Sequence, residues 1–229
     1  ALARIFFNVF GLTPATSWIL ITLAVLSMSV GGLLAFGQSD IKRLFAYSSI
    51  SQMGYIALGL GVGTPLAIFG SLFHLFNHSI VKSLLFLNSG SIEEISGTRY
   101  LDKISGIILK APVTGYTNLI GALSICGMPP LGGFWSKLII ILACIQAGHP
   151  ILALLAAVIS IMTLAYYFRA LTPALFGETV EQSPPGTVPF SWFKAIPMVI
   201  LAVLSIISVF MIVPSGMNSA NILLRGAAA

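Results

Sequence analysis

The sequence predicts an all-α protein, a bundle of several membrane-spanning helices, and two observations support this. Of its 229 residues, 57% are hydrophobic and 7% are charged, whereas soluble domains carry roughly 25% charged residues. The apolar runs are also continuous and about 20 residues long, the length of a helix that crosses the hydrocarbon core. Strands of an outer-membrane barrel would alternate between apolar and polar residues instead. The composition therefore excludes a soluble enzyme.

The apolar runs divide the chain into whole spans and one partial span. Residues 1–12 read as the last turns of a preceding transmembrane helix, and residues 214–229 as a small polar tail. Because the chain starts without Met and inside this helical pattern, we expect a fragment of a longer polypeptide or a chain whose first half is missing. The predicted whole spans are residues 18–36, 44–62, 65–92, 112–147, 150–170 and 194–213.

One of these runs is too long for a straight crossing. As a single helix, residues 112–147 would be roughly 54 Å long, against a hydrocarbon core of ~30 Å. Its middle, residues 127–133, reads Gly-Met-Pro-Pro-Leu-Gly-Gly, which no helix crosses intact. A hairpin would leave only about 15 residues on each side, too few for a full span. We therefore predict one broken helix, with irregular backbone that is buried in protein or lines a cavity.

The basic residues predict the orientation of the spans. If the loops alternate sides, Arg4 and Arg225 fall on one side and seven basic residues on the other. By the positive-inside rule, the loops at 37–43, 93–110 and 171–193 are then cytoplasmic. The net charge of +5 is thus read as a topology signal, and no nucleic-acid partner is expected. We expect the inner or plasma membrane of a cell, or its mitochondrial or organellar equivalent. The seven residues are Lys42, Arg43, Arg99, Lys103, Lys110, Arg169 and Lys194.

All the ionisable residues predicted at membrane depth are basic: His74, His78, Lys82 and Lys137. All the carboxylates are predicted in loops. Ionisable groups inside a membrane are costly and mark functional sites by default. His74, His78 and Lys82 are spaced i, i+4, i+8, so they share one helix face and rise about 6 Å per step. That spacing suits proton transfer through single bridging waters, and we interpret the stripe as a proton path. The alternative is a set of interhelical hydrogen bonds.

Lys137 lies one turn beyond the Gly132-Gly133 pair of the predicted break. A break frees backbone carbonyls and admits water, so a lysine there can gain and lose a proton; snorkelling to the interface is the alternative. Asp40, Lys42 and Arg43 form a compact charged loop. This loop either fixes the topology or supports a channel mouth, a role that would fall to Asp40 and Lys42.

The sequence predicts no cofactor and no metal site. Cys126 and Cys144 both lie in apolar runs, without CxxC or Cys/His spacing, so packing is favoured over a disulfide or a metal site. No quinone, flavin, haem or iron–sulfur motif occurs, so this chain itself is expected to carry out no redox chemistry.

Three segments, in this order, resemble the antiporter-like subunits that respiratory complex I, Mrp cation/proton antiporters and membrane-bound hydrogenases share. They are residues 39–55 (SDIKRLFAYSSISQMGY), 74–82 (HLFNHSIVK) and 127–137 (GMPPLGGFWSK). The resemblance covers nearly the whole chain. Members contain two inverted five-helix repeats, each with a broken helix. The resemblance implies that residues 18–170 are the second repeat and that residues 194–229 are the final transmembrane helix and tail.

The resemblance also implies a role for each basic residue. Lys82, with His74 and His78, corresponds to the relay along the membrane, and Lys137 to the terminal site that exchanges protons with the outside. Some members carry Glu at that last position. The resemblance implies a proton-translocating subunit of a redox-driven complex of the NADH dehydrogenase or membrane-bound hydrogenase type. Its partners would be other membrane subunits, including a homologous antiporter-like subunit or the missing first half.

Three alternative functions remain at this point. A Mrp-type Na⁺/H⁺ antiporter subunit fits the same motifs, although the lack of intramembrane carboxylates argues against a Na⁺ site in this half. A carrier for a small organic solute would also use a broken helix. A structural scaffold would lose assembly, rather than pumping, on substitution of Lys82 or Lys137.

Overall fold

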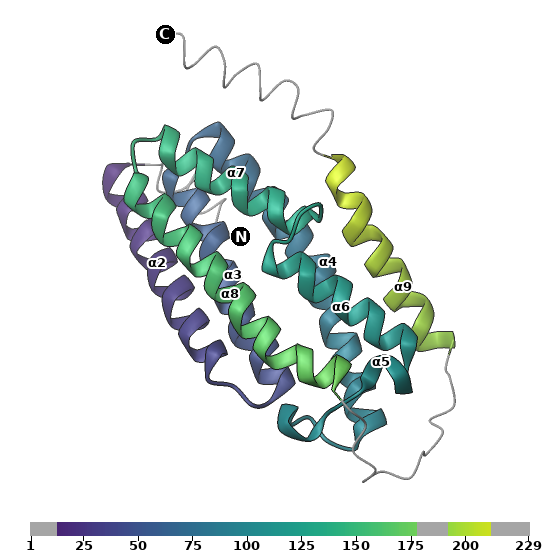
Figure 1. The fold of residues 1–229 in the computed structure, drawn as a ribbon. Coiled ribbons are helices and arrows are strands. Elements are labelled where there is room, and N and C mark those ends of the chain that lie inside the picture. The colour runs from purple at the N-terminus through teal and green to yellow at the C-terminus, as the bar shows by residue number, and fades with distance from the viewer. Residues whose placement is uncertain (1–12, 178–191, 212–229) are drawn as a thin grey trace.

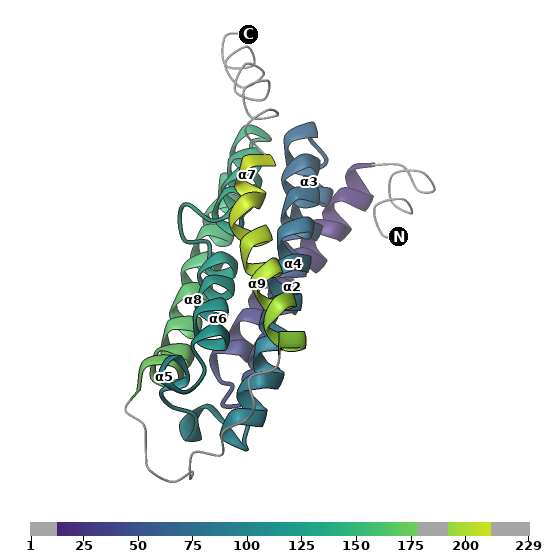
Figure 2. The same ribbon diagram turned by 90° about the vertical axis from the view of Figure 1, so that its right-hand side faces the viewer.

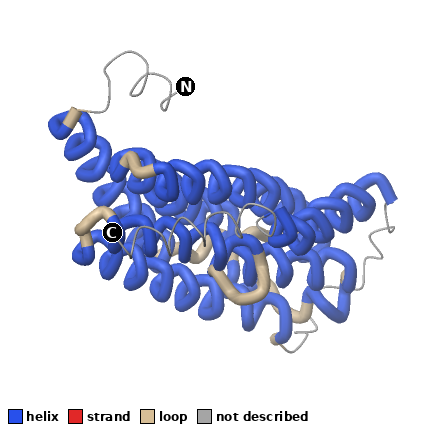
Figure 3. Tube along the Cα trace, turned by 90° about the horizontal axis from the view of Figure 1, so that it is seen from above, coloured by secondary structure: helices blue, strands red, loops and turns tan. Residues whose placement is uncertain are grey.

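The computed structural model describes residues 13–177 and 192–211, and within these ranges the chain consists of helices and loops without a strand (Figure 3). The helices pack side by side into an elongated bundle (Figures 1 and 2). The predicted all-α class is confirmed. In chain order the helices are α2 (Pro14–Phe36), α3 (Ile41–Val62), α4 (Pro65–Ser96), α5 (Ile107–Lys110), α6 (Pro112–Cys126), α7 (Gly132–Gln146), α8 (Pro150–Phe176) and α9 (Trp192–Ile207), with 3₁₀ turns at Leu101–Lys103 and Ser208–Met211.

Capping residues set where the helices begin. Thr13 and Thr64 each accept a backbone N–H from the first turn of the following helix, and a proline follows each of them. Proline at the first helical position loses no hydrogen bond, because that N–H has no partner inside a helix. Asp40 caps α3, its Oδ1 accepting the N–H groups of Lys42 at 2.9 Å and Arg43 at 3.2 Å.

Several predicted helix bounds are wrong at the charged end of the bundle. Helix α3 starts at Ile41, not at residue 44, and α4 continues to Ser96. Glu93 and Glu94 are therefore helical, whereas the sequence analysis placed them in a loop. Helix α8 likewise continues to Phe176 beyond the predicted end at residue 170. The predictions equated helices with apolar runs, but a helix extends past the apolar stretch wherever its polar residues are solvated or paired. Predictions for residues 1–12, 178–191 and 212–229, including those for Arg4, Glu178, Glu181 and Arg225, lie outside the described residues.

Helix α4 is the central element, packing against α3, α6, α7 and α9. In the described part of the chain, three helices are long and apolar enough to cross a membrane: α2, α8 and the stretch Trp192–Phe210. Helices α3 and α4 are also long, with 22 and 32 residues. Their buried faces, however, carry serine, asparagine, histidine and lysine. Buried polar faces on otherwise apolar helices indicate that α3 and α4 line the polar interior of the bundle.

Ion pairs hold one end of the bundle together. Asp40 Oδ2 lies 2.9 Å from Nε of Arg99, Lys42 Nζ lies 2.5 Å from Glu93 Oε2, and Lys194 on α9 pairs with Glu94. These contacts join the start of α3, the end of α4 and the start of α9. The pairs with Lys42 and Lys194 are exposed, so each contributes little free energy of unfolding.

Close packing of α2 against α3 depends on Gly54. A Cβ atom at this residue would lie 2.7 Å from the backbone nitrogen of Met28 and 2.8 Å from the carbonyl oxygen of Ala24. Backbone atoms cannot move aside as a flexible side chain can. Small residues at such helix contacts let membrane helices approach closely.

We expect Gly54→Ala to destabilise the protein by about 1–3 kcal/mol, the usual cost of overpacking. Thermal unfolding of the purified protein in detergent measures this. Gly90→Ala is the matched control, because nothing lies within 4 Å of a Cβ at that helical position, and it should be neutral or slightly stabilising. Equal unfolding midpoints for the two variants would contradict the proposed close contact.

Candidate functional site

The predicted stripe of basic residues lies on α4 and faces the interior. The ring centroids of His74 and His78 are 6.4 Å apart, which agrees with the rise of about 6 Å expected for one helical turn. Lys137, on α7, is buried as well. The exposed fractions are 1% for His74, 5% for His78, 6% for Lys82 and 2% for Lys137.

His74 connects α4 with two other helices. Its Nδ1 lies 2.8 Å from Oγ of Ser136 on α7, and its Nε2 lies 3.1 Å from Oε1 of Gln52 on α3. A carbonyl oxygen only accepts, so in this arrangement Nε2 donates to Gln52. Nδ1 then accepts from the Ser136 hydroxyl when the ring is neutral, or donates to it when the ring is protonated. The imidazole can therefore take up a proton without moving.

Lys82 is surrounded by neutral oxygen acceptors. Its Nζ donates to the carbonyl of Phe45 at 2.7 Å, to Oγ of Ser48, and to the hydroxyl of Tyr167 at 3.3 Å. Ser48 and Tyr167 also hydrogen-bond to each other at 2.9 Å. An ammonium group has three N–H donors, and each has an acceptor here. The site can thus hold a protonated lysine although none of these partners is a carboxylate.

Lys137 is held by the end of a helix. Its Nζ donates to the carbonyl of Ile125 at 2.8 Å and lies 5.2 Å from the ring centroid of Tyr55. Ile125 is in the last turn of α6, where carbonyls have no partner inside the helix. Helix α6 ends at Gly127, whose φ of 82° lies in the left-handed region that favours glycine.

The chain around this helix end is tightly packed. Residues 127–131 separate α6 from α7. A Cβ at Gly133 would lie 1.8 Å from the carbonyl oxygen of Ser124, so only glycine allows the first turn of α7 to approach α6 this closely. This approach lets Lys137, one turn later, reach the end of α6.

Several buried polar atoms beside the stripe have no hydrogen-bond partner in the described part of the chain. Among them are Nε2 of Gln52, Oδ1 of Asn77 and Nε2 of His78. Leaving such a group without a partner costs about 1–3 kcal/mol, and buried water usually satisfies groups of this kind. The interior therefore offers polar positions for water between the basic side chains.

Asp40 and Lys42 are not brought into this cluster. Among the described residues, their side chains contact the first turn of α3, Arg99 and Glu93 at the charged end. Asp40 is buried, whereas the side chain of Lys42 is 39% exposed.

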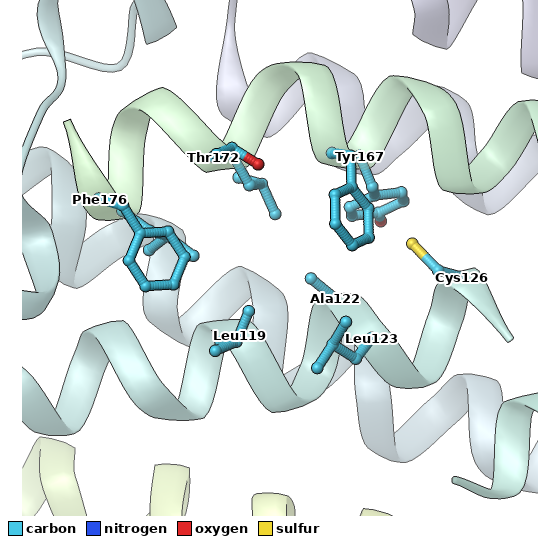
Figure 4. A pocket seen from close by; sticks show the side chains of 10 residues that line it. Leu119, Ala122, Leu123, Cys126, Tyr167, Thr172 and Phe176 are labelled. Atoms are coloured by element: carbon cyan, nitrogen blue, oxygen red, sulfur yellow. The ribbon is translucent and has the colours of Figure 1, made fainter. Parts of the chain in front are cut away.

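A small pocket lies between α6 and α8. Tyr167 and Cys126 are at one end, Leu119 and Phe176 at the other (Figure 4). Its lining is mostly apolar. The hydroxyl of Tyr167 bonds to Lys82, so the same tyrosine lines this pocket and contacts the basic stripe.

No group of three or more His, Cys, Asp or Glu side chains in the described ranges is arranged to hold a metal ion. Cys126 and Cys144 are free thiols, and both are buried in apolar clusters.

The sequence analysis missed three contact residues of the site: Tyr55, Ser136 and Tyr167. Tyr55 and Tyr167 occur in apolar runs, where a tyrosine signals packing as readily as hydrogen bonding. Ser136 immediately precedes Lys137, and the charged lysine is the stronger sequence signal of the two. Only the tertiary fold brings Tyr167 beside Lys82, 85 positions away in the chain.

Comparison with known proteins identifies the family. The model of the transmembrane family "NADH:quinone oxidoreductase/Mrp antiporter, TM" matches residues 1–163. A Na⁺/H⁺ antiporter component of Alkalihalophilus pseudofirmus is 38% identical over 187 residues, which covers 80% of this chain and 38% of that protein. A component of the NADH-quinone oxidoreductase of Desulforudis audaxviator is 37% identical over 175 residues, covering 73% of this chain and 35% of that protein.

A solved structure has the same fold. A chain of the Mrp complex from Dietzia sp. superposes with a TM-score of 0.84 at 27% identity, covering 91% of this chain and 47% of that chain. This chain thus corresponds to less than half the length of each of these proteins. It is an integral membrane protein and belongs to the family of NADH:quinone oxidoreductase/Mrp antiporter transmembrane subunits.

Proposed function

We propose that this chain forms part of a proton path through an antiporter-like subunit, made of His74, His78, Lys82 and Lys137. One observation carries the proposal: His74, Lys82 and Lys137 bond to neutral oxygens, and among the described residues no carboxylate pairs with these groups or with His78. A structural ion pair would supply an opposite charge. Groups that must gain and lose a proton instead need surroundings that tolerate both states.

In this mechanism the proton moves between groups through short water bridges. His74 changes between donating to and accepting from Ser136, and the unpartnered Nε2 of His78 takes part through water. Lys82 and Lys137 both lie in the buried interior of the bundle. Because like charges repel more strongly in a medium of low dielectric constant, protonation of one lysine favours release from the other.

The family's architecture supports further proposals on topology. Helices α6 and α7 have 15 residues each, too few to cross the hydrocarbon core singly, and they follow one another along the bundle (Figures 1 and 2). We propose that together they form one broken crossing in a second five-helix repeat spanning residues 18–170, with 194–229 as the final helix and tail. The segments 37–43, 93–110 and 171–193, which include helix ends, are then on the cytoplasmic side.

The chain corresponds to only 35–38% of the curated relatives' length, so a complete path needs further elements. We propose that a homologous antiporter-like subunit, or another part of the same subunit, supplies the inlet. The whole assembly would be a redox-driven pump or a Mrp-type antiporter. This chain contributes the ion path, while electron transfer takes place in partner subunits.

Asp40 and Lys42 have a supporting role in this proposal. Their contacts fasten the start of α3 to Arg99 and Glu93. Phe45 and Ser48, which hold Lys82, lie one to two turns further along α3. Fastening the start of α3 therefore keeps the Lys82 acceptors in register with α4.

Replacing either buried lysine by methionine should separate stability from transport. We expect Lys82→Met and Lys137→Met to leave the unfolding midpoint unchanged or raised, because a buried charge is replaced by an apolar side chain of similar size. Transport by the assembled complex in sealed vesicles should fall by roughly tenfold or more, as for loss of a proton-transferring group.

Lys110→Met is the matched control, since Lys110 is an exposed lysine at the end of α5, and it should transport normally. Native transport in both buried-lysine variants would contradict the proposal and favour a scaffold role. Assembly and redox turnover must be followed in the same preparations.

Two substitutions of Asp40 distinguish its role as the helix cap of α3 from a role of its negative charge. Asn caps helices about as well as Asp, whereas Ala loses roughly 1 kcal/mol. We therefore expect Asp40→Asn to transport within about twofold of native and Asp40→Ala to lower the unfolding midpoint. Transport as low in Asp40→Asn as in Lys82→Met would mean that the carboxylate itself takes part in the ion path.

A further inference from the structure

Helix α9 reaches the break between α6 and α7 with a hydroxyl group. Ser205 on α9 donates to Oγ of Ser124 on α6 at 3.0 Å, and both side chains are buried. Between this contact and the Lys194–Glu94 ion pair at the start of α9, Met198 and Ala202 pack against Leu84 of α4. The hydroxyl pair is therefore a specific polar contact within an apolar interface. Helix α9 also lies beyond residues 1–163, which the family model matches.

The 3₁₀ turn after α9, Ser208–Met211, also contacts the break between α6 and α7. A Cβ at Gly132, the first residue of α7, would lie 2.3 Å from Oγ of Ser208 and 2.4 Å from Oδ1 of Asn77. Side chains from α4 and from the end of α9 thus meet at the bare Cα of Gly132. This contact fixes the start of α7 against α9, as the Ser205–Ser124 bond fixes the end of α6.

These contacts bear on Lys137. Ser124 precedes Ile125, whose carbonyl accepts the hydrogen bond of the Lys137 ammonium at 2.8 Å. The last turn of α6 is followed by Gly127 in a left-handed conformation, so no continuing helix holds it in place. A shift of a few tenths of an ångström there changes the length of the bond to Lys137 directly.

We propose that Ser205 is a positioning residue: through Ser124 it holds the last turn of α6 so that the Ile125 carbonyl stays within hydrogen-bonding distance of Lys137. The proposal rests on the proposed function, in which Lys137 exchanges the transported proton. Helix α9 then becomes a working part of the ion path instead of a separate span beside it.

The test compares Ser205→Ala with Ser205→Thr, which keeps the hydroxyl, in vesicles that contain the assembled complex. Loss of a neutral hydrogen bond corresponds to a factor of about 2–10, so transport per assembled complex should fall by that factor in Ser205→Ala and recover in Ser205→Thr. Ser89→Ala is the matched control, because the buried Ser89 bonds, among the described residues, to the Phe86 carbonyl of its own helix. It should transport normally.

The double variant Ser124→Ala/Ser205→Ala tests the route of the effect. If Ser205 acts through Ser124, the double variant is no slower than either single variant, and Ser124→Ala reports on the same bond should the α9 variant assemble poorly. If the losses of the two single variants multiply in the double variant, the proposal is overturned. Native transport in Ser205→Ala with only lowered stability would overturn it as well.

The Lys137→Met variant distinguishes a failure of the proposed function from a failure of the positioning role of Ser205. Native transport in that variant overturns the proposed function together with this inference, whereas lost transport there with native transport in Ser205→Ala overturns only the positioning role.

Discussion

The rest of this structure depends on the cost of holding an ammonium group inside a membrane protein without a carboxylate beside it. Such a group is stable only if each of its N–H donors meets an oxygen. Lys82 meets this requirement with a backbone carbonyl and two hydroxyls from α3 and α8. Lys137 meets it in part, with a carbonyl at the end of α6 and the ring of Tyr55. The acceptors are neutral, so they stabilise the charge without locking it in place. An acid partner would make either lysine a permanent ion pair.

The interruption between α6 and α7 follows from the same requirement. A carbonyl inside a helix already accepts an N–H from the next turn, so a lysine can only share it, as Lys82 shares the Phe45 carbonyl of α3. A carbonyl in the last turn of a helix has no such partner. Ending α6 in the interior of the bundle leaves carbonyls in its last turn, and Ile125 provides one to Lys137. Gly133 then lets α7 start close enough for its own lysine to reach that carbonyl. The glycine-rich, proline-containing sequence of residues 127–133 thus places a charge acceptor in the interior.

The sequence predicts the helices and the basic stripe better than it predicts the residues that contact the stripe. Proline and glycine mark the turns so strongly that most helix ends near Pro14, Pro65 and Pro150 were correct within a few residues. The i, i+4, i+8 spacing placed the basic stripe on one buried face, because a helix is regular over that distance. The ends at Ile41 and Ser96 were missed, since polar residues at a helix end read like a loop. The acceptors Tyr167 and Ser136 were unpredictable, because a neutral hydroxyl carries no signal in the sequence until the fold brings it beside a charge.

Helix α7 links the two halves of the site through adjacent residues. Ser136 hydrogen-bonds to His74 and Lys137 to Ile125, so one turn of α7 contacts both the α4 stripe and the end of α6. Gly132 and Gly133, just before that turn, let the start of α7 lie close to α4, α6 and Ser208. In the proposed mechanism, a change in charge on Lys137 that alters its bond to Ile125 also acts, through this turn, on the hydrogen bond of His74. The stripe and the break are thus connected through the second turn of α7.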